Sequence, residues 1–155
     1  MHQHILIPTD GSELSQKAID YGMALAKSVN AKVTVMTVSM PFYTLAVEPG
    51  MITDTPEQYG KRMATLATKY LNVANEAALA AGVSCDTLHV EHDHPYLAII
   101  ETASQKSCDL IVMASHGRRG ISAIVLGSET VKVLTHSTIP VLVFRASHPP
   151  FFIAS

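Results

Sequence analysis

Residues 109–128 read DLIVMASHGRRGISAIVLGS, and this stretch decides the fold. It opens with the apolar run LIVM at 110–113, bounded by turn-forming residues, which is typical of a fully buried strand in a parallel sheet. A small-residue turn at 114–117 follows, and Gly127 and Ser128 open a predicted helix whose free N–H groups Ser128 can cap. This order predicts a cradle for phosphate, because N–H groups at the start of a helix attract anions and glycine lets a ligand approach the backbone.

The rest of the chain alternates short apolar runs with amphipathic segments that carry capping and stop signals at their ends. Predicted strands cover residues 4–8, 31–38, 85–91, 109–113 and 140–144. Predicted helices cover residues 12–30, 56–81, 95–106 and 128–136. Strands that alternate with helices predict an α/β fold, an open five-stranded parallel sheet with helices on both faces. The expected strand order is 3-2-1-4-5, of the Rossmann-like kind.

A switch point between strands one and four follows from this order, and ligands of open sheets bind beside such a point, at the carboxyl ends of the strands. We therefore expect Asp10 and the turn at 113–117 to meet in one crevice. Asp10 or Ser12 is expected to cap the first helix, and Asn30 and Gly82 are expected to end the first and second helices.

Apolar residues at three- and four-residue steps predict one core-facing stripe on each helix. The predicted stripes are Leu14, Ala18, Tyr21 and Leu25, then Tyr59, Met63, Leu66, Tyr70, Val73 and Ala77, then Leu97, Ile100 and Ala103. Between strand two and the second helix the periodicity fails over residues 39–55, where prolines and a glycine predict a long loop. Such a loop is a lid, a partner surface or an excursion without a role.

Three segments together resemble the universal stress protein family, of the type that carries an ATP-binding motif. They are IPTDGS at 7–12, the whole of 109–128, and IPVLV at 139–143. The family's signature is Gly, two residues, Gly, nine residues, then Gly with Ser or Thr, and Ala114 stands here at the first glycine. The resemblance implies a family domain over residues 1–146 and leaves residues 147–155 as a C-terminal tail, which either wraps a partner or is disordered.

The resemblance also implies a nucleotide site. Its expected residues are Pro8, Thr9, Asp10, Val38, Met113, Ala114, Gly117, Arg118, Gly127, Ser128 and Glu129. Asp10 would contact the ribose or a metal on the phosphates, or act as a helix cap. Val38 and Met113 would border adenine, or be core residues. The two later glycines and Ser128 would face the phosphates. Arg118 would screen phosphate charge, or lie in a solvated loop.

The function implied is binding of an adenine nucleotide, ATP or else AMP or ADP, with Mg²⁺ or Mn²⁺ on the phosphates. Slow hydrolysis or autophosphorylation would be the most catalysis expected, and Ser12 and Ser128 are candidates by position alone. The alternative is a stress protein that binds no nucleotide and acts through protein–protein contacts, which the extra methyl of Ala114 favours. The resemblance further implies a homodimer through the strand at 140–145, a short apolar edge strand of a kind that invites pairing.

Composition excludes several other classes. A length of 155 residues fits one domain, and a formal charge of −2 gives no basic excess for nucleic-acid binding. No apolar run approaches a membrane span and no signal peptide is recognised, so we expect a cytoplasmic protein. The two cysteines, Cys85 and Cys108, are expected to be reduced thiols.

Motifs for other chemistry are absent or incomplete. Neither a Walker lysine motif nor a Gly-x-Gly-x-x-Gly turn occurs in the sequence. Ser115 and His116 lie near the expected crevice, but without a Gly-x-Ser-x-Gly elbow they do not predict a hydrolase. His89, His92 and His94 form a local cluster with two carboxylates, whose spacing across a strand end fits titrating surface histidines better than a zinc or other transition-metal site.

Overall fold

The computed structural model describes residues 1–45, 54–117 and 125–145 of the chain. Its strands are β1 (His4–Pro8), β2 (Lys32–Ser39), β3 (Cys85–Glu91), β4 (Leu110–Ala114) and β5 (Val141–Phe144). Its helices are α1 (Glu13–Val29), α2 (Phe42–Leu45), α3 (Pro56–Ala81), α4 (Pro95–Gln105) and α5 (Ser128–His136). All strand pairs are parallel, in the order β3-β2-β1-β4-β5, which confirms the predicted fold class and strand order.

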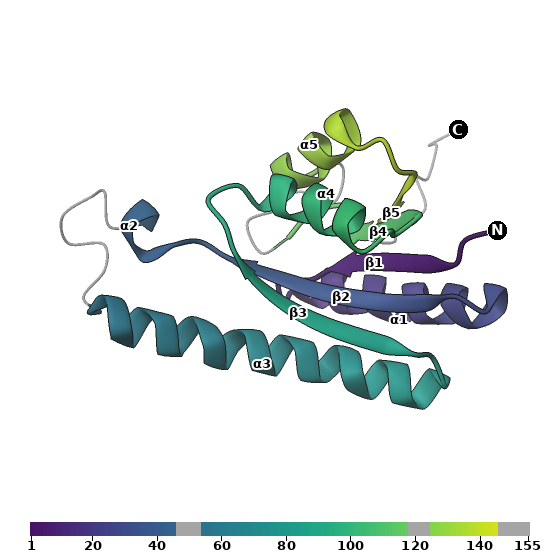
Figure 1. The fold of residues 1–155 in the computed structure, drawn as a ribbon, viewed down its shortest axis with the longest axis horizontal. Coiled ribbons are helices and arrows are strands. Elements are labelled where there is room, and N and C mark those ends of the chain that lie inside the picture. Colours follow the sequence, from purple (N-terminus) through teal and green to yellow (C-terminus); the bar gives the residue numbers. More distant parts are fainter. Residues whose placement is uncertain (46–53, 118–124, 146–155) are drawn as a thin grey trace, which may run out of the picture.

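The helices form two layers, with α1 and α3 on one face of the sheet and α4 and α5 on the other (Figure 1). Side chains alternate between the faces along each strand, so each strand serves both layers. On β1, Ile5 and Ile7 belong to the core beneath α1 and α3, whereas Leu6 belongs to the core beneath α4 and α5. All three are fully buried, which is why the strands read as unbroken apolar runs.

Capping residues fix the helix ends where the sequence places them. Ser12 caps α1 through its side chain, which accepts a hydrogen bond from the N–H of Ser15. Asn30 and Gly82 end α1 and α3 in the left-handed conformation, which asparagine and glycine adopt more readily than other residues. Thr55 starts α3 with a reciprocal capping box. Helix bounds were therefore predictable to within a residue or two.

The predicted core stripes are partly wrong. On α1, Tyr21 is 44% exposed and packs its ring against Phe144, although the other stripe residues are buried or partly buried. On α3 Tyr59 is buried as predicted, but the other buried positions are Ala67, Leu71, Ala74 and Ala78, one position after the predicted residues. On α4 they are Ala98, Ile99, Thr102 and Ala103, so that Leu97 and Ile100 are only partly buried. On α3 and α4 most of the residues that pack against the sheet are alanine or threonine. A search for large apolar residues does not find these positions.

The segment predicted as one long loop contains the short helix α2, and its residues 46–53 lie outside the described residues. Both cysteines are free, as expected, and burial raises the pKa of Cys108 to about 11. Across residues 1–45, 54–117 and 125–145, none of the helices combines the length and apolarity that a membrane crossing requires.

Candidate functional site

A cavity of about 590 Å³ opens at the carboxyl ends of β1, β2 and β4. Ten of the eleven residues expected at a nucleotide site line it: Pro8, Thr9, Asp10, Val38, Met113, Ala114, Gly117, Gly127, Ser128 and Glu129. The eleventh, Arg118, lies outside the described residues. Residues from four separate parts of the chain therefore share one cavity, at the switch point between β1 and β4.

The turn after β1 is held by its own hydroxyl and carboxylate groups. Asp10 Oδ1 accepts a hydrogen bond from the N–H of Ser12 at 2.9 Å. Thr9 Oγ1 accepts one from the N–H of Gly11 and lies 3.0 Å from Ser15 Oγ, which donates to the carbonyl of Ser12. The hydroxyl of Thr9 and Oδ1 of Asp10 are thus both used inside the turn.

Two features of the turn require glycine at position 11. Its φ of +76° lies in the left-handed region, which other residues adopt at a cost. A Cβ at this position would also overlap the ring of Tyr70 from α3. The aromatic ring therefore rests on the backbone of the β1 turn and fixes α3 beside the cavity.

Two glycines after β4 allow close approach between segments. A Cβ on Gly117 would collide with the carboxylate of Asp10, so the β1 and β4 turns touch at this point. Gly127 lies against His116, where a Cβ would come within 3.1 Å of the His116 Cα. The N–H of Gly127 donates to the carbonyl of Ser115 at 2.7 Å, which ties the start of α5 to the end of β4.

Helix α5 begins at the cavity, but Ser128 does not cap it as expected. The cap residue is Gly127, which has no side chain to offer, and Ser128 is the first helical residue with its side chain exposed. The N–H groups of Ser128, Glu129 and Thr130 precede the first helical hydrogen bond, which Val131 donates to Gly127. These N–H groups and the helix dipole favour a negative charge in the cavity.

The carboxylate of Glu129 is used between helices. Oε2 accepts a hydrogen bond from the N–H of Tyr96 at 2.8 Å, in the first turn of α4, and Oε1 lies 3.4 Å from Lys132 Nζ. Glu129 therefore joins the starts of α4 and α5, which together form one side of the cavity. While its carboxylate makes these contacts, Glu129 can contact a ligand only through its backbone N–H.

Val38 and Met113 form an apolar side of the cavity. Both belong to the core cluster beneath α4 and α5, with Met113 buried and Val38 partly buried. Pro8 and Ile99 line the same cavity. This side offers a flat apolar surface next to the open start of α5, so a ligand with a planar ring and an anionic group would find both surfaces together.

Ala114, which stands where the family motif has glycine, is the last residue of β4. Its side chain packs with Leu14 and Ala18 of α1, and its φ is not positive. Its carbonyl accepts a hydrogen bond from Thr130 Oγ1 at 3.0 Å. The methyl group therefore fills space beneath α1, and the backbone here does not require glycine.

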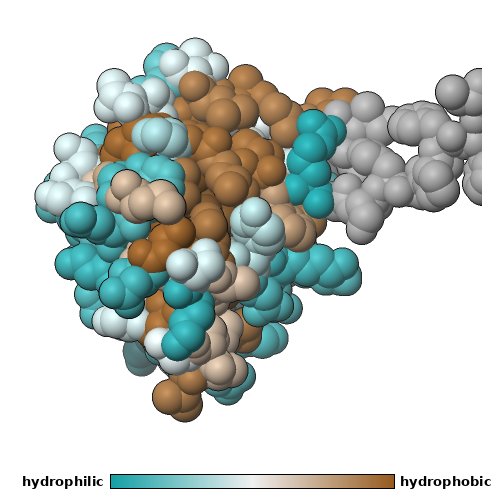
Figure 2. Space-filling view, turned by 90° about the vertical axis from the view of Figure 1, so that its right-hand side faces the viewer, coloured by the Kyte–Doolittle hydropathy of each residue, from teal (hydrophilic) through white to brown (hydrophobic). Residues whose placement is uncertain are grey.

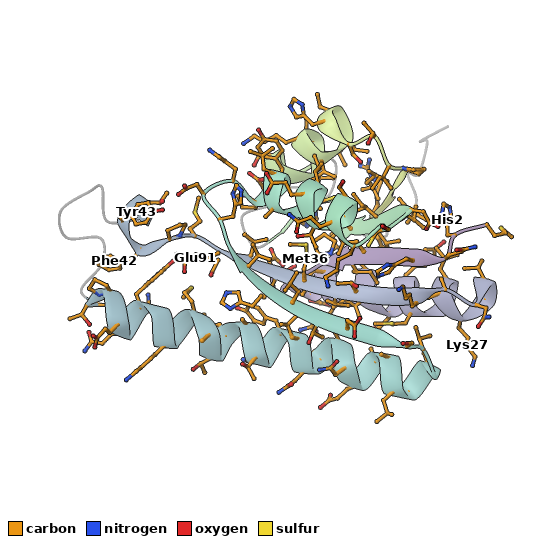
Figure 3. All side chains as sticks on the ribbon, viewed as in Figure 1. His2, Lys27, Met36, Phe42, Tyr43 and Glu91 are labelled. Atoms are coloured by element: carbon orange, nitrogen blue, oxygen red, sulfur yellow. The ribbon has the colours of Figure 1, made fainter. Side chains whose placement is uncertain are left out.

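The sequence prediction missed an entire wall of the cavity, which α3 supplies. Tyr59, Met63, Leu66 and Tyr70 line it. Tyr59 donates a hydrogen bond to the carbonyl of Met40 at 2.6 Å. Burial, with a smaller effect of the Glu91 carboxylate, raises the pKa of Tyr59, so its phenol stays protonated as a donor. Figure 3 shows Phe42 above the start of α3, where its ring packs edge-on against Tyr59.

The signal for this wall was present in the sequence. These four residues form the first part of the stripe that was assigned to the core. An apolar stripe on a helix has the same spacing whether it packs on a sheet or lines a cavity. The regular core positions of α3 carry alanine, and the larger stripe beside them marks the open side.

The histidines that suggested a metal site make separate contacts. His89 Nε2 lies 2.7 Å from Ser39 Oγ, and His89 lines the cavity. His92 Nδ1 accepts a hydrogen bond from the N–H of His94, while His92 Nε2 lies 3.7 Å from Glu101. In the part of the chain that the structure describes, no three His, Cys, Asp or Glu residues converge on a common metal position.

The neighbouring Ser115 and His116 do contact each other, with Ser115 Oγ 3.2 Å from His116 Nδ1. Ser115 is only 1% exposed, so its hydroxyl is closed to a substrate. Its carbonyl is occupied by the N–H of Gly127. The pair therefore stabilises the β4 turn and does not form a hydrolase nucleophile with its base.

A model of the universal stress protein family matches residues 1–145. Universal stress protein YxiE of Bacillus subtilis is 31% identical over 149 residues, covering 94% of this chain and 100% of the relative. Universal stress protein MJ0531 of Methanocaldococcus jannaschii is 32% identical over 149 residues, covering 94% of this chain and 83% of that protein.

Solved structures agree with the sequence relatives. The structure of hypothetical protein MJ0577 superposes with a TM-score of 0.78 at 28% identity, covering 96% of this chain and 99% of that one. A universal stress protein in complex with cAMP gives a TM-score of 0.67 at 26% identity, covering 94% of this chain and 98% of that one. The fold, the cavity at its switch point and the matched length lead to one conclusion: the chain belongs to the universal stress protein family.

Proposed function

We propose that the cavity binds an adenine nucleotide, with ATP as the leading candidate and AMP or ADP as smaller versions of the same ligand. One observation carries the proposal. The turn at Asp10 and the turn at Gly117 touch at the rim of a cavity onto which the start of α5 opens. A relative of 26% identity was solved with the nucleotide cAMP, which supports a ligand of this class.

The adenine ring would rest on the apolar side formed by Val38 and Met113. A planar ring gains from burial against apolar side chains, and its polar edge can pair with backbone groups at the strand ends. The ribose would lie towards Asp10, whose carboxylate can accept hydrogen bonds from hydroxyl groups. These are the positions expected from the sequence for adenine and ribose.

The phosphates would lie at the N–H groups of residues 128–130, between Gly117 and Gly127. Mg²⁺ or Mn²⁺ would accompany them. Such an ion takes most of its ligands from phosphate and water and needs only one or two carboxylates from the protein, a demand that Asp10 fits. The protein would then be a nucleotide-responsive binding module with at most slow hydrolysis or autophosphorylation.

The alternative, a family member that binds no nucleotide, was favoured by the methyl group of Ala114. That methyl packs against Leu14 and Ala18, so it gives no steric ground for the alternative. A homodimer through residues 140–145 is compatible with both functions, because β5 is an edge strand with Val131 and Leu134 of α5 exposed at 44% and 42%. Figure 2, which views the molecule from the right-hand side of Figure 1, shows hydrophobic residues gathered in the upper half of that face.

The test is to identify what the protein carries. Gently purified full-length protein is denatured, and the released small molecules are separated by anion-exchange chromatography. We expect an adenine nucleotide in the supernatant, or uptake of ATP with Mg²⁺ when the purified protein is dialysed against it. Protein that releases no nucleotide and takes up none at millimolar ATP would show that the alternative holds.

A further inference from the structure

The cavity extends to both faces of the sheet, and its second part has no role in the proposed nucleotide site. Side chains alternate along β2, so Val38 points to the α4 and α5 layer, whereas Thr37 and Ser39 share the face of Val33 and Val35, beneath α1 and α3. His89 shares the face of Cys85 on β3 by the same alternation. Thr37, Ser39 and His89 all line the cavity.

Helix α3 closes this second part from the other side. It is fixed near the end of β2, where Tyr59 donates to the carbonyl of Met40. It is fixed again at the β1 turn, where the ring of Tyr70 rests on Gly11. Tyr59 and Tyr70 are eleven positions apart, which is roughly 16 Å along the helix.

Met63 and Leu66 lie between those two fixed points and line the cavity without joining the buried core of α3. We name the space bounded by Ser39, Tyr59, Met63, Leu66, Tyr70 and His89 the α3 compartment. It has an apolar wall on the helix and a polar floor on the strand ends. Of its six residues none is a lysine, arginine or carboxylate.

We propose that the α3 compartment is a second ligand site, for a small uncharged molecule with an aromatic or branched aliphatic body and one hydrogen-bonding group. The body would contact Met63, Leu66 and the two tyrosine rings. The polar group would pair with Nδ1 of His89, because Nε2 already lies 2.7 Å from Ser39 Oγ. An anion is disfavoured, because none of the six residues carries a positive charge and the Arg62 guanidinium, 5.8 Å over the Tyr59 ring, is already paired with Asp54 at 2.7 Å.

This inference does not rest on the proposed nucleotide site, because Met63, Leu66 and His89 are not among the residues expected to hold the nucleotide. The probe is N-phenyl-1-naphthylamine, an uncharged aromatic amine with one N–H donor, whose fluorescence rises in apolar surroundings. The full chain has no tryptophan, so the signal of the dye is not mixed with indole emission. The dye is titrated with and without saturating ATP and Mg²⁺.

Leu66→Gln is the test variant, and Leu79→Gln is its matched control on the same helix, where Leu79 is 85% exposed. We expect Leu66→Gln to weaken dye binding by roughly tenfold, because it places an amide in the apolar wall, and Leu79→Gln to leave it unchanged. Met63→Gln is a second test variant in case Leu66→Gln unfolds, and thermal unfolding checks each protein. ATP affinity, measured by dialysis, should be the same in all variants.

Two results would overturn the inference. If the dye does not bind, or if Leu66→Gln and Leu79→Gln weaken it equally, the α3 compartment is no ligand site. If ATP displaces the dye in full and Leu66→Gln weakens ATP as well, the compartment belongs to the nucleotide. A protein that binds the dye as expected but no ATP would contradict the nucleotide proposal alone.

Discussion

At the amino ends of the strands, side chains take up the backbone N–H groups, whereas at the carboxyl ends the N–H groups at the start of α5 open onto a cavity. Asp109 illustrates the closed end: Oδ2 accepts from the N–H of Gln3 at 2.8 Å and Oδ1 from the N–H of His4 at 3.3 Å. His2 lies at this end, far from Phe42 at the other (Figure 3). The proposed binding site and these stabilising contacts thus lie at opposite ends of one sheet, and we predict that each can be changed without the other.

The largest effect is expected from a side chain added where the two turns touch. Gly117→Val would place its Cβ against the carboxylate of Asp10, and we expect ATP affinity to fall about 100-fold, or ~2.7 kcal/mol. Gly60→Val is the matched control, because a Cβ there meets nothing within 4 Å. Isothermal titration with Mg-ATP measures both. Equal affinities in the two variants would mean that the contact between the turns does not shape the site.

The next effect separates the closed end from the open one. Asp109→Ala removes the acceptor for two backbone N–H groups, and we expect it to lower the free energy of unfolding by about 1–2 kcal/mol. ATP affinity should stay within about twofold of the wild type. Urea denaturation and ATP titration measure the two quantities, with Asp20→Ala on the exposed face of α1 as control. A large loss of affinity would show that the ends are coupled.

A pH dependence of stability should also come from the closed end. His4 is 6% exposed, with Nδ1 donating to the carbonyl of Lys106 and Nε2 lying 2.8 Å from Thr34 Oγ1. Burial, and then the charge of Lys32, lower the pKa of His4 below 6.5. The unfolded chain therefore binds the proton more readily, and stability is complete above pH 6.5 and falls as the pH drops below it.

We expect the free energy of unfolding to fall as the pH drops from 7 to 5.5, because the unfolded chain takes up the proton first. His4→Gln should flatten the unfolding free energy over that range, measured by urea denaturation at each pH. His136→Gln, on α5, is the control and should keep the wild-type slope. If both variants keep that slope, a group other than His4 causes the dependence.

The smallest effect is expected at Ala114. Ala114→Gly restores the family motif but removes a methyl that packs with Leu14 and Ala18. We expect ATP affinity to change by less than about threefold and stability to fall by about 0.5–1 kcal/mol. A large gain in affinity would show that the native pocket is obstructed at this position.

The difference between the ends also explains what the sequence could predict. Strand order and helix ends followed from local signals: apolar runs, and Asn30 and Gly82 at the ends of helices. Each of these signals lies within the strand or helix that it predicts. The site residues came from the resemblance to the family, and ten of the eleven line the cavity. The structure shows that these residues line one cavity, and their contact with a nucleotide stays a proposal.

The stripe that forms the α3 wall was present in the sequence, but its position at the cavity could not be predicted, because it depends on how α3 packs against distant strand ends. Tyr59 and Tyr70 hold the helix through Met40 and Gly11, contacts that join residues far apart in the sequence. The apolar stripe on α3 was recognised, but its spacing alone could not tell a cavity from a core. Likewise, Glu129 could not be assigned to the start of α4 without the packing of α4 against α5.

The most direct test of the account is equilibrium dialysis of the wild-type chain against radiolabelled ATP with Mg²⁺, in parallel with Gly117→Val. The account predicts saturable uptake of one ATP per chain by the wild type, competed by AMP and ADP, with little uptake by the variant. No saturable uptake by folded wild-type protein at millimolar ATP would contradict the claim that the two turns at the carboxyl ends of β1 and β4 form a nucleotide site.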